Sequence, residues 1–122
     1  MNEITIDIDV NYTEFCVDKS QGLLRDLRRV GERHQILSTQ LRKSSGGRTH
    51  VRVRFFEEIS LFESLCIRAF LNDDPHRLAC DLTRYFMTGN IEDTGRCFNE
   101  KYTKGKLRKA TKWQDIKDLG FI

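Results

Sequence analysis

The sequence has only one proline, Pro75, among its 122 residues. No apolar run approaches the roughly 20 residues that a membrane-spanning helix needs. Repeats, low-complexity segments and a proline-rich linker are also missing, so we expect residues 1–122 to form a single domain. The N-terminus lacks the apolar core of a secretory signal peptide. These absences predict a cytoplasmic protein with no membrane partner.

The four cysteines, Cys16, Cys66, Cys80 and Cys97, include no C-x-x-C pair. This spacing gives no support for a structural zinc site. In a cytoplasmic protein the thiols are expected to stay reduced. Cys66 and Cys80 fall on apolar faces of predicted helices, so we expect both to be small buried hydrophobic residues.

Charge is balanced overall but unevenly distributed along the chain. Lysine and arginine total 21, aspartate and glutamate total 18, and the resulting net charge of +3 does not itself indicate a nucleic-acid partner. Residues 101–113, in contrast, combine six basic side chains with Trp113 and contain no acid. Such a segment can follow a nucleic-acid backbone while the aromatic ring stacks on a base, although a solvated surface segment is the alternative. The candidate contacts in this basic C-terminal segment are Lys104, Lys106, Arg108 and Lys109.

Two segments alternate strictly between apolar and polar residues, which is typical of strands with one buried face. Residues 4–10 read Ile-Thr-Ile-Asp-Ile-Asp-Val, and residues 48–55 read Arg-Thr-His-Val-Arg-Val-Arg-Phe, with the alternation running from His50 to Phe55. If both strands join one sheet, the polar residues share its open face. Carboxylates, imidazole and guanidinium groups together favour a divalent metal ion or a phosphate-bearing ligand, while cross-strand ion pairs are the alternative. The residues concerned are Asp7, Asp9, His50, Arg52 and Arg54, with Arg42 and Arg48 as further cations.

The remaining patterns predict an α+β order of β-α-β-β-α-α. Helical spacing of apolar residues indicates the helices, and the Ser44-Ser45-Gly46-Gly47 turn joins the last two strands. Ser60 with Glu63 forms a predicted capping box, and Asp74 with Pro75 marks the start of the last helix. The order matches the start of an RNA-recognition-motif or ferredoxin-like fold, with helices on one face and an open polar face. The expected elements are strands at 3–10, 35–43 and 48–56, and helices at 20–32, from 60, and from 75 to 87.

Apolar spacing also predicts which side chains of these elements face the core. In the second strand we expect Leu37, Thr39 and Leu41 to share one face. Asp81 is expected to form local ion pairs with Arg77 and Arg84, at helical spacings. The expected core residues of the last two helices are Phe62, Leu65, Cys66, Ala69 and Phe70, followed by Leu78, Leu82, Tyr85 and Phe86.

The Asp-x-Asp strand and the later Ser-x-Gly-Gly-x-x-His segment together resemble the archaeo-eukaryotic primase superfamily, which includes primase-polymerases. The resemblance spans residues 4–55 and implies a minimal catalytic core with an RNA-recognition-like sheet. It implies that Asp7 and Asp9 bind Mg²⁺ or Mn²⁺ and that His50 contacts nucleotide phosphates. The family's third motif, an acid on a strand, has no match, since Asp81 lies in a predicted helix and Asp73 and Asp74 lie in a break between helices. The turn and cationic residues implied in nucleotide or nucleic-acid binding are Ser45, Gly46, Gly47, Arg48, Arg42, Arg52 and Arg54.

The resemblance implies metal-dependent nucleotidyl transfer in DNA replication or repair, in a protein of archaeal or viral type. Its expected partners are nucleotides, DNA or RNA, together with a replication protein or further copies of the chain. Two alternatives remain open. One is a non-catalytic nucleic-acid-binding module that uses the same sheet face, and the other is a viral or plasmid-borne protein-interaction module.

Overall fold

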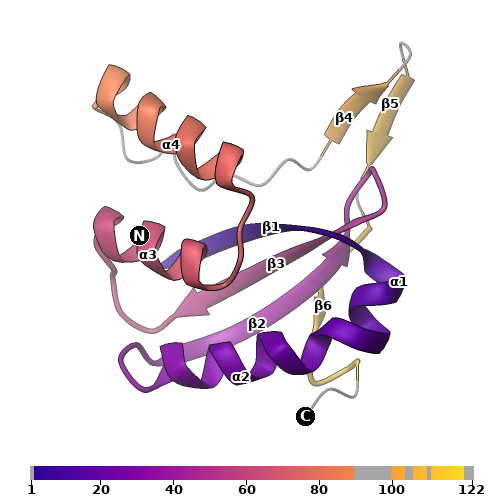
Figure 1. Ribbon diagram of the computed structural model, residues 1–122, viewed down its shortest axis with the longest axis horizontal. Helices are drawn as coiled ribbons and strands as arrows, with labels where there is room; N and C mark the ends of the chain where they lie inside the picture. The colour runs from indigo at the N-terminus through magenta and orange to yellow at the C-terminus, as the bar shows by residue number, and fades with distance from the viewer. Residues whose placement is uncertain (1, 90–99, 104–105, 110, 120–122) are drawn as a thin grey trace.

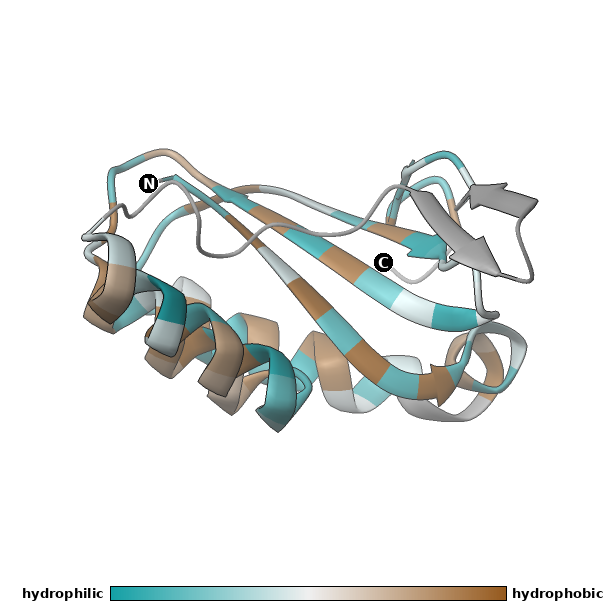
Figure 2. Cartoon of the chain, turned by 90° about the horizontal axis from the view of Figure 1, so that it is seen from above, coloured by the Kyte–Doolittle hydropathy of each residue, from teal (hydrophilic) through white to brown (hydrophobic). Residues whose placement is uncertain are grey.

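A computed structural model describes residues 2–89, 100–103, 106–109 and 111–119 of the chain (Figure 1). These residues form an α+β fold with a four-stranded antiparallel sheet in the order β1-β3-β2-β6 and a separate two-stranded ribbon of β4 and β5. The helices lie on one side of the four-stranded sheet (Figure 2). The elements are β1 (Glu3–Asn11), α1 (Tyr12–Glu14), η1 (Phe15–Lys19, a π-helix), α2 (Ser20–Gly31), β2 (Ile36–Lys43), β3 (Arg48–Phe55), α3 (Leu61–Phe70), α4 (Pro75–Thr88), β4 (Glu100–Thr103), β5 (Lys106–Lys109) and β6 (Gln114–Asp115).

The strand and helix positions predicted between residues 3 and 88 are confirmed, with one omission. The segment after β1, which we expected to be a polar connection, is helical and leads through α1 and η1 directly into α2. Asn11 starts it by accepting a hydrogen bond from the backbone N–H of Thr13 at 3.0 Å. Its single buried apolar side chain, Phe15, joins the core.

The hydrophobic core lies between the sheet and the helices α2 and α3. Alternate residues of β1 and β3 point into it, as the alternation predicted, and they meet the predicted apolar stripe of α2. This arrangement leaves the other residues of each strand on the opposite, polar face. The core residues of these elements include Ile4, Ile6 and Ile8 of β1, Val51, Val53 and Phe55 of β3, and Leu23, Leu24, Leu27 and Val30 of α2.

The β2–β3 hairpin turns at Gly47, whose φ of +84° lies in the left-handed region that favours glycine. Leu41 and Thr39 of β2 are buried as predicted, but Leu37 is 54% exposed. The prediction for Leu37 was wrong because the β2–β3 register shifts between Ile36 and Ser38, and an irregularity of this kind breaks the alternation of faces.

The ends of α3 and α4 agree with the sequence signals. Ser60 Oγ accepts from the backbone N–H of Glu63 at 3.1 Å and donates to the Glu63 carboxylate at 3.1 Å. Asp74 accepts from the backbone N–H of His76 at 2.9 Å, and Gly89 ends α4 with φ +67°. Both helix starts and the stop are therefore fixed by local chemistry.

The predicted core faces of α3 and α4 were largely wrong. On α3, Phe62, Cys66, Ala69 and Phe70 are exposed and Leu65 is partly buried, whereas Ser64, Ile67 and Arg68 are buried. On α4, Leu82 and Phe86 are exposed and Leu78 and Tyr85 are partly buried. The buried residues of α4 are Arg77 and Asp81. Cys80 is exposed like Cys66, so the expectation that both are buried was also wrong, and Cys97 lies outside the described residues.

Buried charges explain why α3 and α4 leave their apolar stripes exposed and bury other faces. The fully buried Asp73 carboxylate accepts from Arg68 Nε at 2.7 Å and from Arg77 Nη1 at 3.0 Å. Arg68 Nη2 also lies 2.8 Å from the Asp81 carboxylate, a contact between the two helices that local spacing did not predict. Buried ions need partners, so this cluster fixes how α3 and α4 pack.

The same cluster covers the outer edge of β1. Asp73 Oδ1 accepts from the backbone N–H of Asp7 at 2.8 Å, and the backbone N–H of Asp74 donates to the carbonyl of Asp7 at 3.0 Å. Arg77 donates to the Thr5 carbonyl and to Thr5 Oγ1, both at 2.6 Å. The junction between α3 and α4 thus pairs with a strand edge that would otherwise expose its backbone polar groups.

Across the described ranges, no helix combines the length and apolar character that crossing a bilayer requires.

Candidate functional site

The polar face of the sheet is organised in rows that cross β1, β3 and β2. Asp7 lies opposite His50, and His50 lies opposite Arg42. The neighbouring row places Thr5, Arg52 and Gln40 side by side, and the next contains Glu3, Arg54 and Ser38. The register therefore brings together most of the strand residues that the sequence selected.

Asp9 is separated from this arrangement. The β1–β3 register shifts between Ile8 and Asn11, so Asp9 has no place in the rows. Its side chain is 80% exposed and contacts Arg48 Nη1 at 2.8 Å. Simple alternation predicts that Asp7 and Asp9 lie side by side on one face. The local irregularity of the strand takes Asp9 out of the register that Asp7 follows.

His50 is buried between charged neighbours. Its Nδ1 accepts a hydrogen bond from Arg42 Nε at 2.9 Å, and its Nε2 lies 3.8 Å from Asp7 Oδ1. Burial, followed by the charges of Arg42 and Arg77, lowers the pKa of His50 to about 4. Because Nδ1 accepts, the neutral ring carries its proton on Nε2, which faces the side of Asp7. His50 can therefore donate one hydrogen bond at neutral pH.

Asp7 is surrounded by other acids. Burial raises its pKa, the charge of Arg77 opposes that change, and Asp73, Asp74 and Asp9 raise it further. Asp73 and Asp74 lie in a break between helices, where the sequence alone does not place them beside a strand. The fold places that break against Asp7, across 66 residues of chain, and no local sequence signal reports such a contact.

The acids around Asp7 already have other partners. Asp73 is held by arginines, Asp74 caps α4, and Asp9 contacts Arg48. Within the described part of the chain, no group of three or more His, Cys, Asp or Glu side chains is arranged to hold a metal ion. Asp7 is the carboxylate of this group best placed to add an oxygen ligand beside His50.

Trp113 lies across the cationic part of the polar face. Its ring centroid is 4.3 Å from the guanidinium carbon of Arg42, 4.6 Å from that of Arg52 and 6.5 Å from the ring centroid of His50. The two guanidinium distances are typical of cation–π contacts. Arg52 also hydrogen-bonds to Gln40, which fixes its guanidinium along the strand.

The position of Trp113 depends on contacts along β2. Thr111 accepts from the backbone N–H of Lys43 at 2.9 Å, and its own N–H donates to the Lys43 carbonyl at 3.0 Å. Directly after Trp113, β6 pairs with β2, and Ile116 enters the core. Sequence reasoning selected Trp113 as a possible stacking residue but did not place it on the sheet.

The remaining predicted site residues divide into two groups. The turn that contains Ser45, Gly46 and Gly47 is held against α1, since the Gly47 carbonyl accepts from the N–H of Tyr12 at 3.0 Å. Arg54 Nε contacts the Glu3 carboxylate at 2.8 Å and is about half exposed. Among the predicted basic C-terminal residues, Lys104 lies outside the described residues. The backbone places Lys106, Arg108 and Lys109 in β5.

Comparison with known proteins gave no match to a protein-family model, a curated protein or a solved structure.

Proposed function

We propose that this chain is a nucleic-acid-binding domain whose ligand lies on the polar face of β1, β3 and β2. The observation that carries the proposal is the placement of Trp113 on the guanidinium groups of Arg42 and Arg52. The chain segment directly before Trp113, residues 101–112, contains six basic residues. An aromatic ring beside cations, on a strand face, is the arrangement that binds single-stranded nucleic acids by stacking and charge.

The exposed ion pairs at the margin of this face support the proposal. Arg48 and Arg54 contact Asp9 and Glu3, but all four side chains are between 41% and 80% exposed. Exposed ion pairs contribute little stability, so phosphate groups can replace the carboxylates at small cost. Guanidinium groups also suit phosphate through paired hydrogen bonds.

In the buried part of the face, neighbouring side chains hold two arginines in position. Arg42 is fixed by His50, and Arg52 is fixed by Gln40. These contacts hold the two cations beside Trp113 before any ligand arrives, which reduces the ordering cost of binding. The neutral His50 adds a hydrogen-bond donor rather than a charge.

The second candidate is metal-dependent nucleotidyl transfer, as the resemblance to primase-polymerases implies. It is favoured by the acids Asp9, Asp73 and Asp74, whose charges act on Asp7 and raise its pKa. Mg²⁺ or Mn²⁺ would be held by Asp7, joined by Asp9 once that carboxylate leaves Arg48, and would stabilise charge on a transferring phosphate. His50 would orient that phosphate through Nε2–H.

The test is fluorescence anisotropy with a labelled single-stranded oligonucleotide over a series of salt concentrations. We expect saturable binding that weakens with salt, and a logarithmic slope that falls by about 0.7 for each phosphate contact removed. Arg48→Gln and Arg54→Gln should each reduce the slope. Arg28→Gln is the matched control, since Arg28 is exposed on α2, on the other side of the sheet. Unchanged slopes in both test variants would refute the proposal.

The second candidate is separated by adding Mn²⁺ and a nucleoside triphosphate and following backbone chemical shifts. Metal-dependent shifts at β1 and β3 that disappear in Asp7→Asn support nucleotidyl transfer. The asparagine keeps the backbone contacts of residue 7, so loss of the shifts reports the carboxylate. Oligonucleotide binding without any metal-dependent shift favours the binding module alone.

A further inference from the structure

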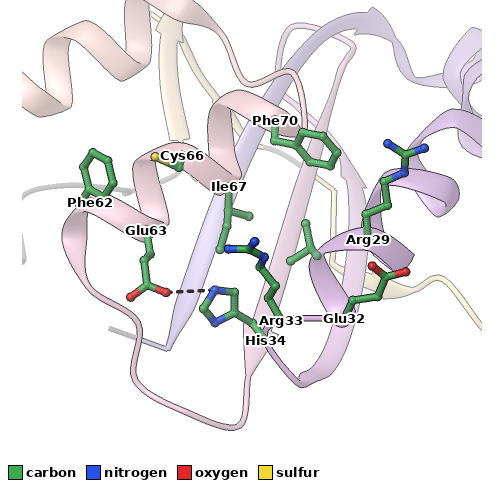
Figure 3. A pocket seen from close by; sticks show the side chains of 10 residues that line it. Arg29, Glu32, Arg33, His34, Phe62, Glu63, Cys66, Ile67 and Phe70 are labelled. Atoms are coloured by element: carbon green, nitrogen blue, oxygen red, sulfur yellow. Dashed lines mark ion pairs between the residues drawn. The ribbon is translucent and has the colours of Figure 1, made fainter.

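A groove runs between α2 and α3, away from the polar face of the sheet (Figure 3). Its volume is about 730 Å³, within the range of cavities that accept ligands or short structural segments. Val30 and Ile67 form its base, and both are buried. Figure 3 shows α3 along one wall; the other, the α2 wall, is formed by Arg29 of α2 and by Arg33 in the turn that follows this helix.

The α3 wall is an apolar stripe without a partner among the described residues. Phe62, Cys66 and Phe70 recur every four residues, so they share one face of the helix. Phe62 is 76% exposed and Phe70 is 46% exposed. At 1.5 Å per residue, the stripe is about 12 Å long, or roughly two helical turns. Exposed apolar surfaces of this kind mark sites of interaction.

The α2 wall is basic. Arg29 and Arg33 are both exposed, lie four residues apart and enter none of the ion pairs found among the described residues. The acid of the opposite wall, Glu63, is already engaged by His34 at 3.0 Å and by Ser60. The His34 ring also makes a T-shaped contact with the Phe55 ring, at 6.1 Å between centroids. Two cations therefore remain available beside the apolar stripe, with Glu32 as the remaining acid of the rim.

We propose that this groove binds an acidic amphipathic helix of a partner protein. Its apolar residues, at helical spacing, would cover Phe62, Cys66 and Phe70. Its carboxylates, also four residues apart, would face Arg29 and Arg33, which match them as forked donors. Apolar burial supplies the affinity, and the two arginines select the sign of the partner's charge.

A second copy of the chain fits this groove less well. A symmetric dimer would bring the same basic wall to both sides of the contact. Each of the described helices of eight residues or more (α2, α3 and α4) carries a single acid: Asp26 is partly buried, Asp81 is buried, and Glu63, with a side chain 46% exposed, is already engaged by His34. None of these three helices therefore offers Arg29 and Arg33 two acids four residues apart, which an acidic amphipathic helix would supply.

The test uses the full chain and two synthetic amphipathic peptides, each about four turns long so that helix formation is favoured. The peptides share the same leucine stripe and carry either glutamate or lysine on its flank. Titrations are followed by backbone chemical shifts and by anisotropy of a labelled peptide. We expect shifts along α2 and α3, and about tenfold tighter binding of the glutamate peptide.

Variants define the contributions of the two walls. The double variant Arg29→Glu/Arg33→Glu should reverse the preference in favour of the lysine peptide, and Phe62→Ser should weaken both peptides. Arg28→Gln is again the control, since it removes a cation of α2 outside the groove. All substituted residues are exposed, so the fold should be preserved, as the dispersion of the spectra will report.

Three results would overturn the proposal. Equal affinity for the two peptides would remove the role of the arginines. Shifts confined to α4 or to the sheet would place binding elsewhere. Groove shifts that appear on raising the protein concentration alone, with a sedimentation mass that doubles, would identify a second copy of the chain as the occupant.

Discussion

Replacing Asp73 with alanine should destabilise the protein by about 3–5 kcal/mol, the usual cost of leaving buried charges without their partner. Its carboxylate has 0% exposure in the ion pairs that it forms with Arg68 and Arg77. It also accepts from the backbone N–H of Asp7 at 2.8 Å and of Asp74 at 2.9 Å. The substitution therefore affects the α3–α4 junction and the edge of β1 together. A domain of this size is stable by about 5–15 kcal/mol, so the loss is a large fraction of the total.

The assay is urea unfolding followed by circular dichroism, with the free energy of unfolding extrapolated to water. The matched control is Asp9→Ala, which also removes an aspartate that contacts an arginine, at 2.8 Å, but at a site where the carboxylate is 80% exposed. We expect Asp9→Ala to cost less than about 1 kcal/mol. If Asp73→Ala costs no more than Asp9→Ala, the reasoning about the buried cluster is refuted.

Further predictions concern pH and thiol exposure. In an NMR titration His50 should show a pKa of about 4, and a value near 6.5 would contradict its burial. Because this pKa is below the unfolded value, stability should fall by at most about 3 kcal/mol between pH 6.5 and 4, and His50→Gln should flatten that fall. The raised pKa of Asp7 acts oppositely: its contribution to stability is fully present below the unfolded pKa of the carboxyl and is lost as pH rises through the folded pKa. Mass-resolved labelling should modify Cys66 and Cys80 faster than the partly buried Cys16, and equal rates would contradict the exposed faces of α3 and α4.

The strands and the first long helix were predictable because one physical rule governed each of them. In β1 and β3 the period of two follows directly from burying one face, and in α2 the leucine stripe follows from packing on the sheet. The caps of α3 and α4 were predictable for a similar reason. Ser60, Asp74 and Gly89 act within a few residues of themselves, so local sequence contains the information.

The faces of α3 and α4 were not predictable from apolar spacing. Phe62 and Phe70 suggest a core stripe, but Arg68 occupies the buried side, where Asp73 and Asp81 neutralise it. The choice depends on ion pairs that exist only after the helices have packed. Apolar periodicity ranks an arginine as solvent-facing, so it assigns the opposite face.

In the candidate site, too, features set by strand alternation were predictable and features set by tertiary contacts were not. Alternation predicted that Asp7 and His50 share a face, and the strand register brings them opposite each other. The displacement of Asp9 depends on a register shift, and the approach of Asp74 to Asp7 depends on contacts between distant segments. Trp113 reaches the sheet through β6, which is only two residues long and leaves almost no pattern in the sequence.

The most direct test of nucleic-acid binding at the polar face follows Trp113 during titration with single-stranded DNA. The indole N–H of Trp113 and the Nε–H groups of Arg42 and Arg52 give separate NMR signals. We expect saturable shifts of all three signals at low salt, reversed by added salt. If binding occurs while these signals stay fixed, or if no binding occurs at low salt, the polar face is not a nucleic-acid-binding surface.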